Sequence, residues 1–214
     1  NLSGALQSKE LTVFEYLKKY VQADGEFDFV TGYFTISALA RLHDTFDKQT
    51  QYRIVLGDID SAKPNRTKII DLINQKHSVE DVFDMKTHCE RAVEFLKQDC
   101  VEVKTVDKHF CHAKCYIYTQ PSNSRNNNSF FIVGSSNFTE AGLGMRPSSN
   151  IELNKFIQSS DYSYTEAKKW FDNLWNSDSA RLQMKNEAKE TVTVKQFLIQ
   201  LIEQFFKKYS PKEV

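Results

Sequence analysis

Residues 110–118 read FCHAKCYIY, and residues 130–137 read FFIVGSSN. Both stretches are rich in aromatic or β-branched residues and the second ends in a turn signal, so each predicts a β-strand. Side chains two apart on a strand point to the same face. The first strand would then have one polar face and one small, apolar face that suits a core. The polar face holds His112, Lys114, Tyr116 and Tyr118, and the apolar face holds Cys111, Ala113, Cys115 and Ile117.

Pairing these two strands as a hairpin places the end of the second beside the start of the first. Gly134, Ser135 and Asn137 then lie next to His112 and Lys114. Histidine can attack phosphorus or pass a proton, lysine can hold a phosphate oxygen, and asparagine can donate a neutral hydrogen bond. The two stretches together therefore predict a phosphate site.

Strands alternate with helices along the rest of the chain. Strands are expected at 26–34, 52–56, 101–106 and around Glu152, and helices at 36–46, 67–75, 79–97, 164–175 and 194–206. This order predicts an α/β fold with a central mixed β-sheet flanked by helices. We expect a catalytic domain over 1–178. Residues 179–214 would be a C-terminal helical extension that packs on this domain or leads to a domain outside the chain.

The site residues resemble the motif of the phospholipase D superfamily, which runs His-x-Lys, then an acidic residue, then Gly-Ser-x-Asn. His112 and Lys114 match the first part, and Gly134, Ser135 and Asn137 match the last. The resemblance implies a phospholipase D-like fold and a phosphodiesterase that needs no metal or other cofactor.

The family usually carries Asp five residues after the Lys, where this chain has Thr119. A later acid, Glu152, resembles the Glu that follows Gly-Ser-x-Asn in metal-independent restriction endonucleases. The stretch 134–152 also resembles nuclease-like modules that precede bacterial helicase domains. The resemblance therefore implies an endonuclease acting on DNA, or on RNA, with a fused helicase domain outside this chain.

Each catalytic residue has an expected role. His112 would attack phosphorus and form a phosphohistidine, and Lys114 and Asn137 would stabilise charge on the non-bridging oxygens. Ser135 would form a hydrogen bond near the phosphate. Glu152 would accept a hydrogen bond from the His112 ring and so fix its tautomer.

Three further residues are expected to bind substrate. Gly134 lies in the motif turn, Arg125 in the polar loop 121–129 could reach a phosphate, and Tyr33 could line the cleft. A mobile hairpin connection is the alternative for that loop, and a core position is the alternative for Tyr33. Gly32 would allow close backbone approach. Ser136 is expected to be incidental.

The mechanism needs a second histidine to protonate the leaving group. None of the other histidines (His43, His77, His88 and His109) has Lys at the second following position. We therefore expect a twofold homodimer in which two copies of His112 face each other across one shared cleft.

Two rival functions remain open. In the first, the site is degenerate, and the chain is a nucleic-acid-binding or partner-binding module of a larger helicase or restriction protein; Thr119 favours it. In the second, the enzyme cleaves lipid, although no membrane-binding signature is visible.

The composition limits these functions. The chain has 214 residues, with 28 Lys and Arg and 28 Asp and Glu, so the formal net charge is zero. Nucleic-acid binding must then rest on a local basic groove. No stretch is long and apolar enough to span a membrane and no signal peptide is visible, so we expect a cytoplasmic protein without a membrane partner. Because the sequence starts at Asn1 rather than Met, we expect either a processed product or a piece of a longer protein.

The cysteines raise the question of a zinc site. Four of them, Cys89, Cys100, Cys111 and Cys115, are interleaved with His88, His109 and His112. There is no Cys-x-x-Cys, and a spacing of four on a predicted strand suits one tetrahedral ion poorly. We therefore expect buried, reduced thiols and no metal.

Overall fold

The computed structural model describes residues 2–4, 12–46, 49–57, 79–106, 111–121 and 128–209. The helix expected at 67–75 and the substrate residue Arg125 lie outside this part of the chain. The expectations for both stay predictions.

A mixed sheet forms the centre of the described structure. It has eight strands in the order β1-β7-β6-β5-β2-β3-β4-β8. Their bounds are β1 (Leu2–Gly4), β2 (Glu26–Thr31), β3 (Gln51–Leu56), β4 (Val101–Val106), β5 (Cys115–Thr119), β6 (Phe130–Gly134), β7 (Ile151–Gln158) and β8 (Ala180–Arg181). β2, β3 and β4 are parallel, and the other neighbours are antiparallel. The predicted mixed sheet is confirmed.

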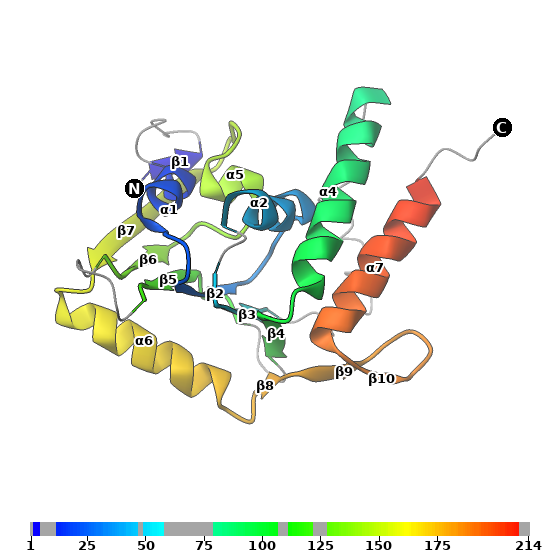
Figure 1. The fold of residues 1–214 in the computed structure, drawn as a ribbon. Helices are drawn as coiled ribbons and strands as arrows, with labels where there is room; N and C mark the ends of the chain where they lie inside the picture. The colour runs from blue at the N-terminus through cyan, green and yellow to red at the C-terminus, as the bar shows by residue number, and fades with distance from the viewer. Residues whose placement is uncertain are drawn as a thin grey trace.

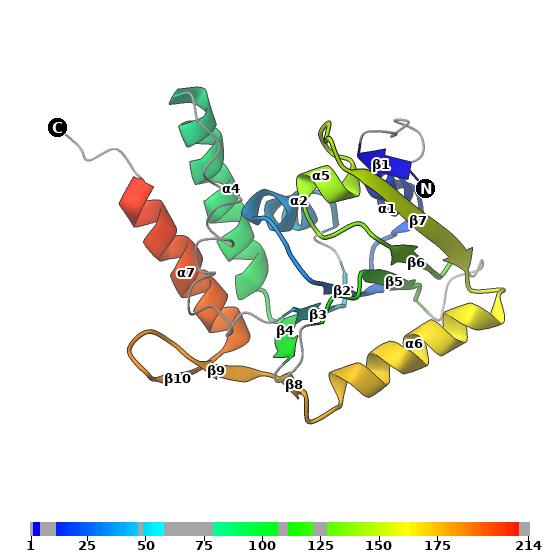
Figure 2. The same cartoon turned by 180° about the vertical axis from the view of Figure 1, so that it is seen from behind.

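Helices cover both faces of this sheet (Figures 1 and 2). One face carries α1 (Val13–Tyr20), α2 (Ile36–Phe46), α4 (Val79–Lys97), α5 (Glu140–Leu143) and α7 (Val194–Tyr209), and the other carries α6 (Tyr162–Trp175). A small hairpin of β9 (Gln183–Lys185) and β10 (Thr191–Thr193) precedes α7. The sheet therefore has a separate apolar core on each side.

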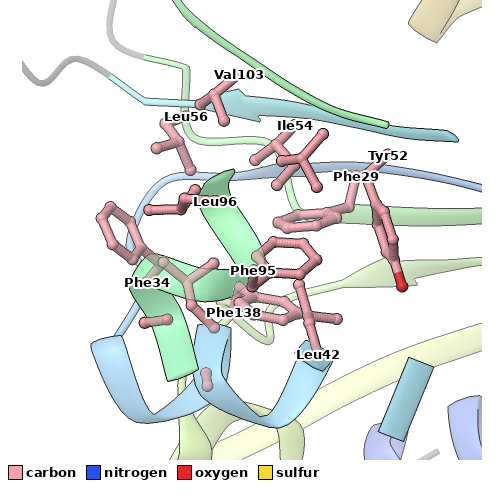
Figure 3. Packing of buried hydrophobic residues seen from close by; sticks show 14 of the residues in the cluster. Phe29, Phe34, Leu42, Tyr52, Ile54, Leu56, Phe95, Leu96, Val103 and Phe138 are labelled. Carbon is pink, nitrogen blue, oxygen red and sulfur yellow. The ribbon is translucent and has the colours of Figure 1, made fainter. Parts of the chain in front are cut away.

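The larger core lies between the parallel strands and helices α2 and α4 (Figure 3). Phe29 of β2 stacks on Phe138 with ring centroids 4.5 Å apart, and Tyr52 of β3 meets Phe95 of α4 edge-on at 5.0 Å. All four side chains are almost fully buried. Because Phe138 directly follows the Gly-Ser-Ser-Asn motif, this core anchors the end of the motif.

The expectation for residues 110–118 needs correction. Strand β5 begins at Cys115, so His112 and Lys114 lie in irregular chain immediately before it. Tyr116 and Tyr118 are buried in the larger core instead of lining a polar face. The sheet is covered on both sides, and the alternation along β5 therefore separates two cores rather than core from solvent.

Other elements agree closely with the sequence. Helices at 36–46 and 79–97 and a strand at 101–106 have the predicted bounds. Helix α1, capped by the Thr12 hydroxyl, was not anticipated. Val194, Leu198 and Ile202 of α7 belong to the larger core, whereas the division of the chain at 178 stays a prediction. None of the described helices is long and apolar enough to cross a membrane.

Candidate active site

The candidate site lies where β5 begins, β6 ends and β7 begins. β5 and β6 pair antiparallel, which confirms the predicted hairpin. The Gly134 N–H donates to the carbonyl of Lys114 at 3.3 Å, and the Ser135 N–H donates to the carbonyl of Leu153 on β7 at 3.1 Å. These backbone bonds bring the two motif halves and the segment that carries Glu152 to one edge of the sheet.

Gly134 is required by this close approach. A Cβ atom here would lie 2.3 Å from the Leu153 carbonyl oxygen and 2.4 Å from Oδ1 of Asn154. Neither gap can hold a methyl group. The expected substrate role of Gly134 stays a prediction, but its steric role at the β6–β7 contact is visible.

Ser135 and Glu152 contact each other directly. The Ser135 hydroxyl donates to the Glu152 carboxylate and accepts the Leu153 N–H at 3.0 Å. Glu152 is 8% exposed, so its carboxylate acts from a nearly buried position. The structure thus places both predicted residues in the site, while the expected bond from the His112 ring to Glu152 stays a prediction.

Lys114 is bonded to the histidine segment and feels the charge of Glu152. It is only 4% exposed, and its Nζ donates to the carbonyl oxygen of His112 at 2.7 Å. Burial lowers the pKa of Lys114, while the charges of Glu152 and Cys111 offset part of that shift. His112, in contrast, is exposed. The geometry offers a solvent-accessible imidazole beside a buried ammonium group.

The side chain of Asn137 is oriented by the segment that follows β2. The Tyr33 backbone N–H donates to Oδ1 of Asn137 at 3.3 Å. A backbone N–H can only donate, so this contact assigns the oxygen and nitrogen of the amide. The amide nitrogen of Asn137 then carries two donors that suit a phosphate oxygen.

Tyr33 contacts the site through its backbone N–H, which bonds to Asn137. The residue as a whole is 39% exposed. The backbone of the neighbouring Gly32 lies close to that of Gly57, since a Cβ added to Gly57 would be 3.1 Å from the Gly32 Cα. The same Cβ would be 2.9 Å from the Cys111 carbonyl oxygen. The ends of β2 and β3 therefore lie against the segment that precedes His112.

Ser136 has a structural role that the sequence analysis missed. It is fully buried, its N–H donates to Oδ1 of Asn154 at 3.3 Å, and its hydroxyl accepts from Nδ2 of Asn154 at 2.9 Å. The Tyr116 hydroxyl donates to the Ser136 carbonyl at 2.7 Å. The alternation of β7 could have indicated Asn154, since it lies two residues after Glu152 and so shares its face.

Thr119, the departure from the family motif, lies away from this site. It ends β5, whereas Lys114 precedes the start of that strand, so the length of β5, about 13 Å, separates the two residues. Its hydroxyl is 2.9 Å from the hydroxyl of Tyr164 on α6. A residue here does not contact a phosphate at His112, so Thr119 is no argument for a degenerate site.

The cysteines are all free thiols, and Cys89 and Cys115 are buried. Within the described ranges, no three His, Cys, Asp or Glu side chains gather as a metal-binding group.

Comparisons with known proteins agree with the fold and the motif. A family model described as "Cardiolipin synthase, PLD-like domain" matches residues 16–175, about three quarters of the chain. The match spans both motif halves and Glu152. A search of curated proteins found no match. The chain belongs to the phospholipase D superfamily.

Proposed function

We propose that this protein is a metal-independent phosphodiesterase, and that it acts on DNA as an endonuclease. The observation that carries the proposal is the exposed His112 beside the buried Lys114, together with the Ser135–Glu152 contact and the proximity of Glu152 to Lys114. The family match indicates phosphodiester chemistry at the family level.

In the proposed reaction, an imidazole nitrogen of His112 attacks phosphorus and forms a P–N bond while the P–O bond to one alcohol breaks. The leaving alkoxide takes a proton from a second histidine. Water then attacks phosphorus and gives its proton back to that histidine, and the P–N bond breaks to leave a phosphomonoester. Lys114 and the amide nitrogen of Asn137 stabilise the charge on the non-bridging oxygens.

The second histidine in this proposal is His112 of another copy of the chain. The supporting observation is the chain's single His-x-Lys triplet. A twofold axis beside His112 would bring two equivalent side chains to opposite sides of one phosphorus atom. We also propose that a helicase domain is fused to this chain, and that the protein has a cytoplasmic location, which suits the free thiols.

A lipid-cleaving or phosphatidyl-transferring enzyme is the second candidate. The family description names cardiolipin synthase. In addition, Ile151 and Leu153 flank Glu152 on β7 and are 67% and 69% exposed, and the Leu153 N–H donates to Ser135. An exposed apolar strip beside the site suits an acyl chain as well as a protein partner.

An activity panel separates these functions. Single-stranded and duplex DNA, RNA and phosphatidylglycerol vesicles are incubated with the protein in EDTA, alongside His112→Asn as the roughly isosteric control. We expect DNA cleavage by the unmodified chain and a loss of at least about a thousandfold in the variant, with unchanged thermal unfolding. Turnover of the vesicles alone would favour the lipid enzyme. Equal DNA cleavage by a folded variant would exclude His112 as the nucleophile.

A further inference from the structure

The hydroxyl of Thr31 joins the end of β2 to the loop that carries Asn137. Thr31 is the last residue of β2 and is fully buried. Its hydroxyl donates to the carbonyl oxygen of Tyr33 at 2.6 Å and accepts the N–H of Phe138 at 2.9 Å. These partners come from segments separated by about a hundred residues of sequence and directly adjoin the Asn137 contact.

We infer that Thr31 is a positioning residue of the phosphate site, which aims the amide of Asn137 by fixing both of its supports. One support is the Tyr33 N–H, which holds Oδ1 of Asn137, and Thr31 fixes the carbonyl of that same residue. The other is the backbone just after Asn137, which Thr31 holds through the Phe138 N–H. The role in catalysis rests on the proposed phosphodiesterase function.

Other contacts keep this region folded without the hydroxyl. The Thr35 N–H donates to the Phe138 carbonyl at 3.1 Å, and Phe34 and Phe138 form an isolated parallel bridge. The Phe138 ring also stacks on Phe29 in the core. Removal of the Thr31 hydroxyl should therefore leave the fold intact while the backbone at Phe138 shifts to satisfy its unpaired N–H.

A shift of this kind affects the chemical step more than binding. Asn137 is proposed to stabilise charge that develops in the transition state, and a misplacement of about 1 Å can lower a rate by about a hundredfold. The remaining contacts with a bound substrate would change little. We therefore expect a fall in kcat with little change in KM.

Three variants test this inference. Thr31→Val removes the hydroxyl at constant size, and Thr31→Ser restores it. Ser129→Ala is the matched control, because the Ser129 hydroxyl is also buried and also accepts a backbone N–H at 2.9 Å, from Gln120, but lies at the end of β6 remote from Gly134.

The first measurement is turnover of bis(p-nitrophenyl) phosphate. We expect kcat to fall about 10- to 100-fold in Thr31→Val, with KM within about twofold of the unmodified value. Thr31→Ser and Ser129→Ala should stay within about threefold in kcat. A general loss of stability would lower the active fraction of both Thr31→Val and Ser129→Ala, whereas a positioning role separates them.

The second measurement is tungstate affinity by calorimetry, which needs no turnover. Tungstate can expand its coordination on a histidine nitrogen and then resembles the transition state rather than the bound substrate, so we expect Thr31→Val to bind tungstate at least about tenfold more weakly than Thr31→Ser and Ser129→Ala. If the unmodified chain cleaves no phosphodiester but tungstate affinity depends on the Thr31 hydroxyl, the phosphodiesterase proposal fails and the positioning role stands. If Thr31→Val matches Ser129→Ala in both measurements, the positioning role is wrong. Absence of both tungstate binding and turnover in the unmodified chain would overturn both.

Discussion

At the scale of single residues, the site depends on the charge of one nearly buried amine. Lys114 is 4% exposed and lies near the Glu152 carboxylate. Burial lowers the pKa of Lys114, so its ammonium group loses the proton at a lower pH than an exposed lysine does. A reaction that needs the ammonium form must therefore decline as the pH rises through this lowered pKa.

We predict that the alkaline limb of kcat/KM lies below the pKa of an ordinary lysine. Glu152 raises the pKa of Lys114, so Glu152→Gln should move this limb to still lower pH. Glu102→Gln, an exposed acid on β4, is the control and should leave the limb unchanged. A pH profile of kcat/KM on bis(p-nitrophenyl) phosphate, whose p-nitrophenolate leaves without a proton from the second histidine, tests the prediction for each protein from neutral to strongly alkaline pH. A limb that moves to higher pH in Glu152→Gln would be the wrong sign for this mechanism.

At the scale of elements, helix α6 is held to the sheet by a partly buried ion-pair network centred on Asp28. Arg53 of β3 contacts the Asp28 carboxylate through Nε at 2.8 Å and through a terminal nitrogen at 2.6 Å. It also contacts Asp172 of α6 at 2.8 Å, and its guanidinium lies 4.9 Å from the ring centre of Phe171. Lys168 of α6 completes the network with a 2.6 Å contact to Asp28.

We predict that Arg53→Met lowers the free energy of unfolding by about 3 kcal/mol, because it leaves the Asp28 carboxylate buried with one cation fewer. The side chain of Asp28 is 1% exposed. Urea denaturation measures the effect. Lys18→Met is the control, since its pair with Glu15 is about half exposed and should contribute less than about 1 kcal/mol. A similar change in both variants would show that the network adds nothing specific.

The sequence predicts some elements well for a physical reason. Helices α2 and α4 have long apolar stripes, and a stripe repeated over several turns marks both the type and the extent of a helix. Helix α1 has only eight residues, with Val13 and Leu17 buried, which is too short for a period to emerge. The strand predicted at 110–118 begins too early, because the alternating pattern of β5 extends back through Cys111 and Ala113 although these residues form irregular chain.

From the sequence, only the part of the site that depends on the pairing of neighbouring strands could be predicted. Hairpin pairing of β5 with β6 is a short-range feature, and it brings Lys114 to Gly134. The contacts of Thr31 and Tyr33 with the Asn137 segment cross about a hundred residues. They depend on β2 lying beside β5, an arrangement set by the packing of the whole sheet. Sequence spacing does not reveal such contacts.

At the scale of the whole molecule, the proposed mechanism makes the dimer the catalytic unit. One cleft would use His112 from both copies, so a mixed dimer with one His112→Asn chain should be inactive. We predict that an equal mixture of unmodified and variant chains, after subunit exchange, has about a quarter of the activity of the same total amount of unmodified protein. Independent sites would leave about half. An activity of one half would exclude the shared cleft.

The covalent role of His112 can be observed directly by mass spectrometry. The protein is mixed with a phosphodiester in EDTA, quenched in alkali during turnover, digested and analysed for a phosphoramidate on histidine. The mechanism predicts an acid-labile adduct on the peptide that contains His112, formed and lost at rates compatible with turnover and absent from His112→Asn. Turnover without an adduct on His112, or an adduct on a different residue, would contradict the proposed mechanism.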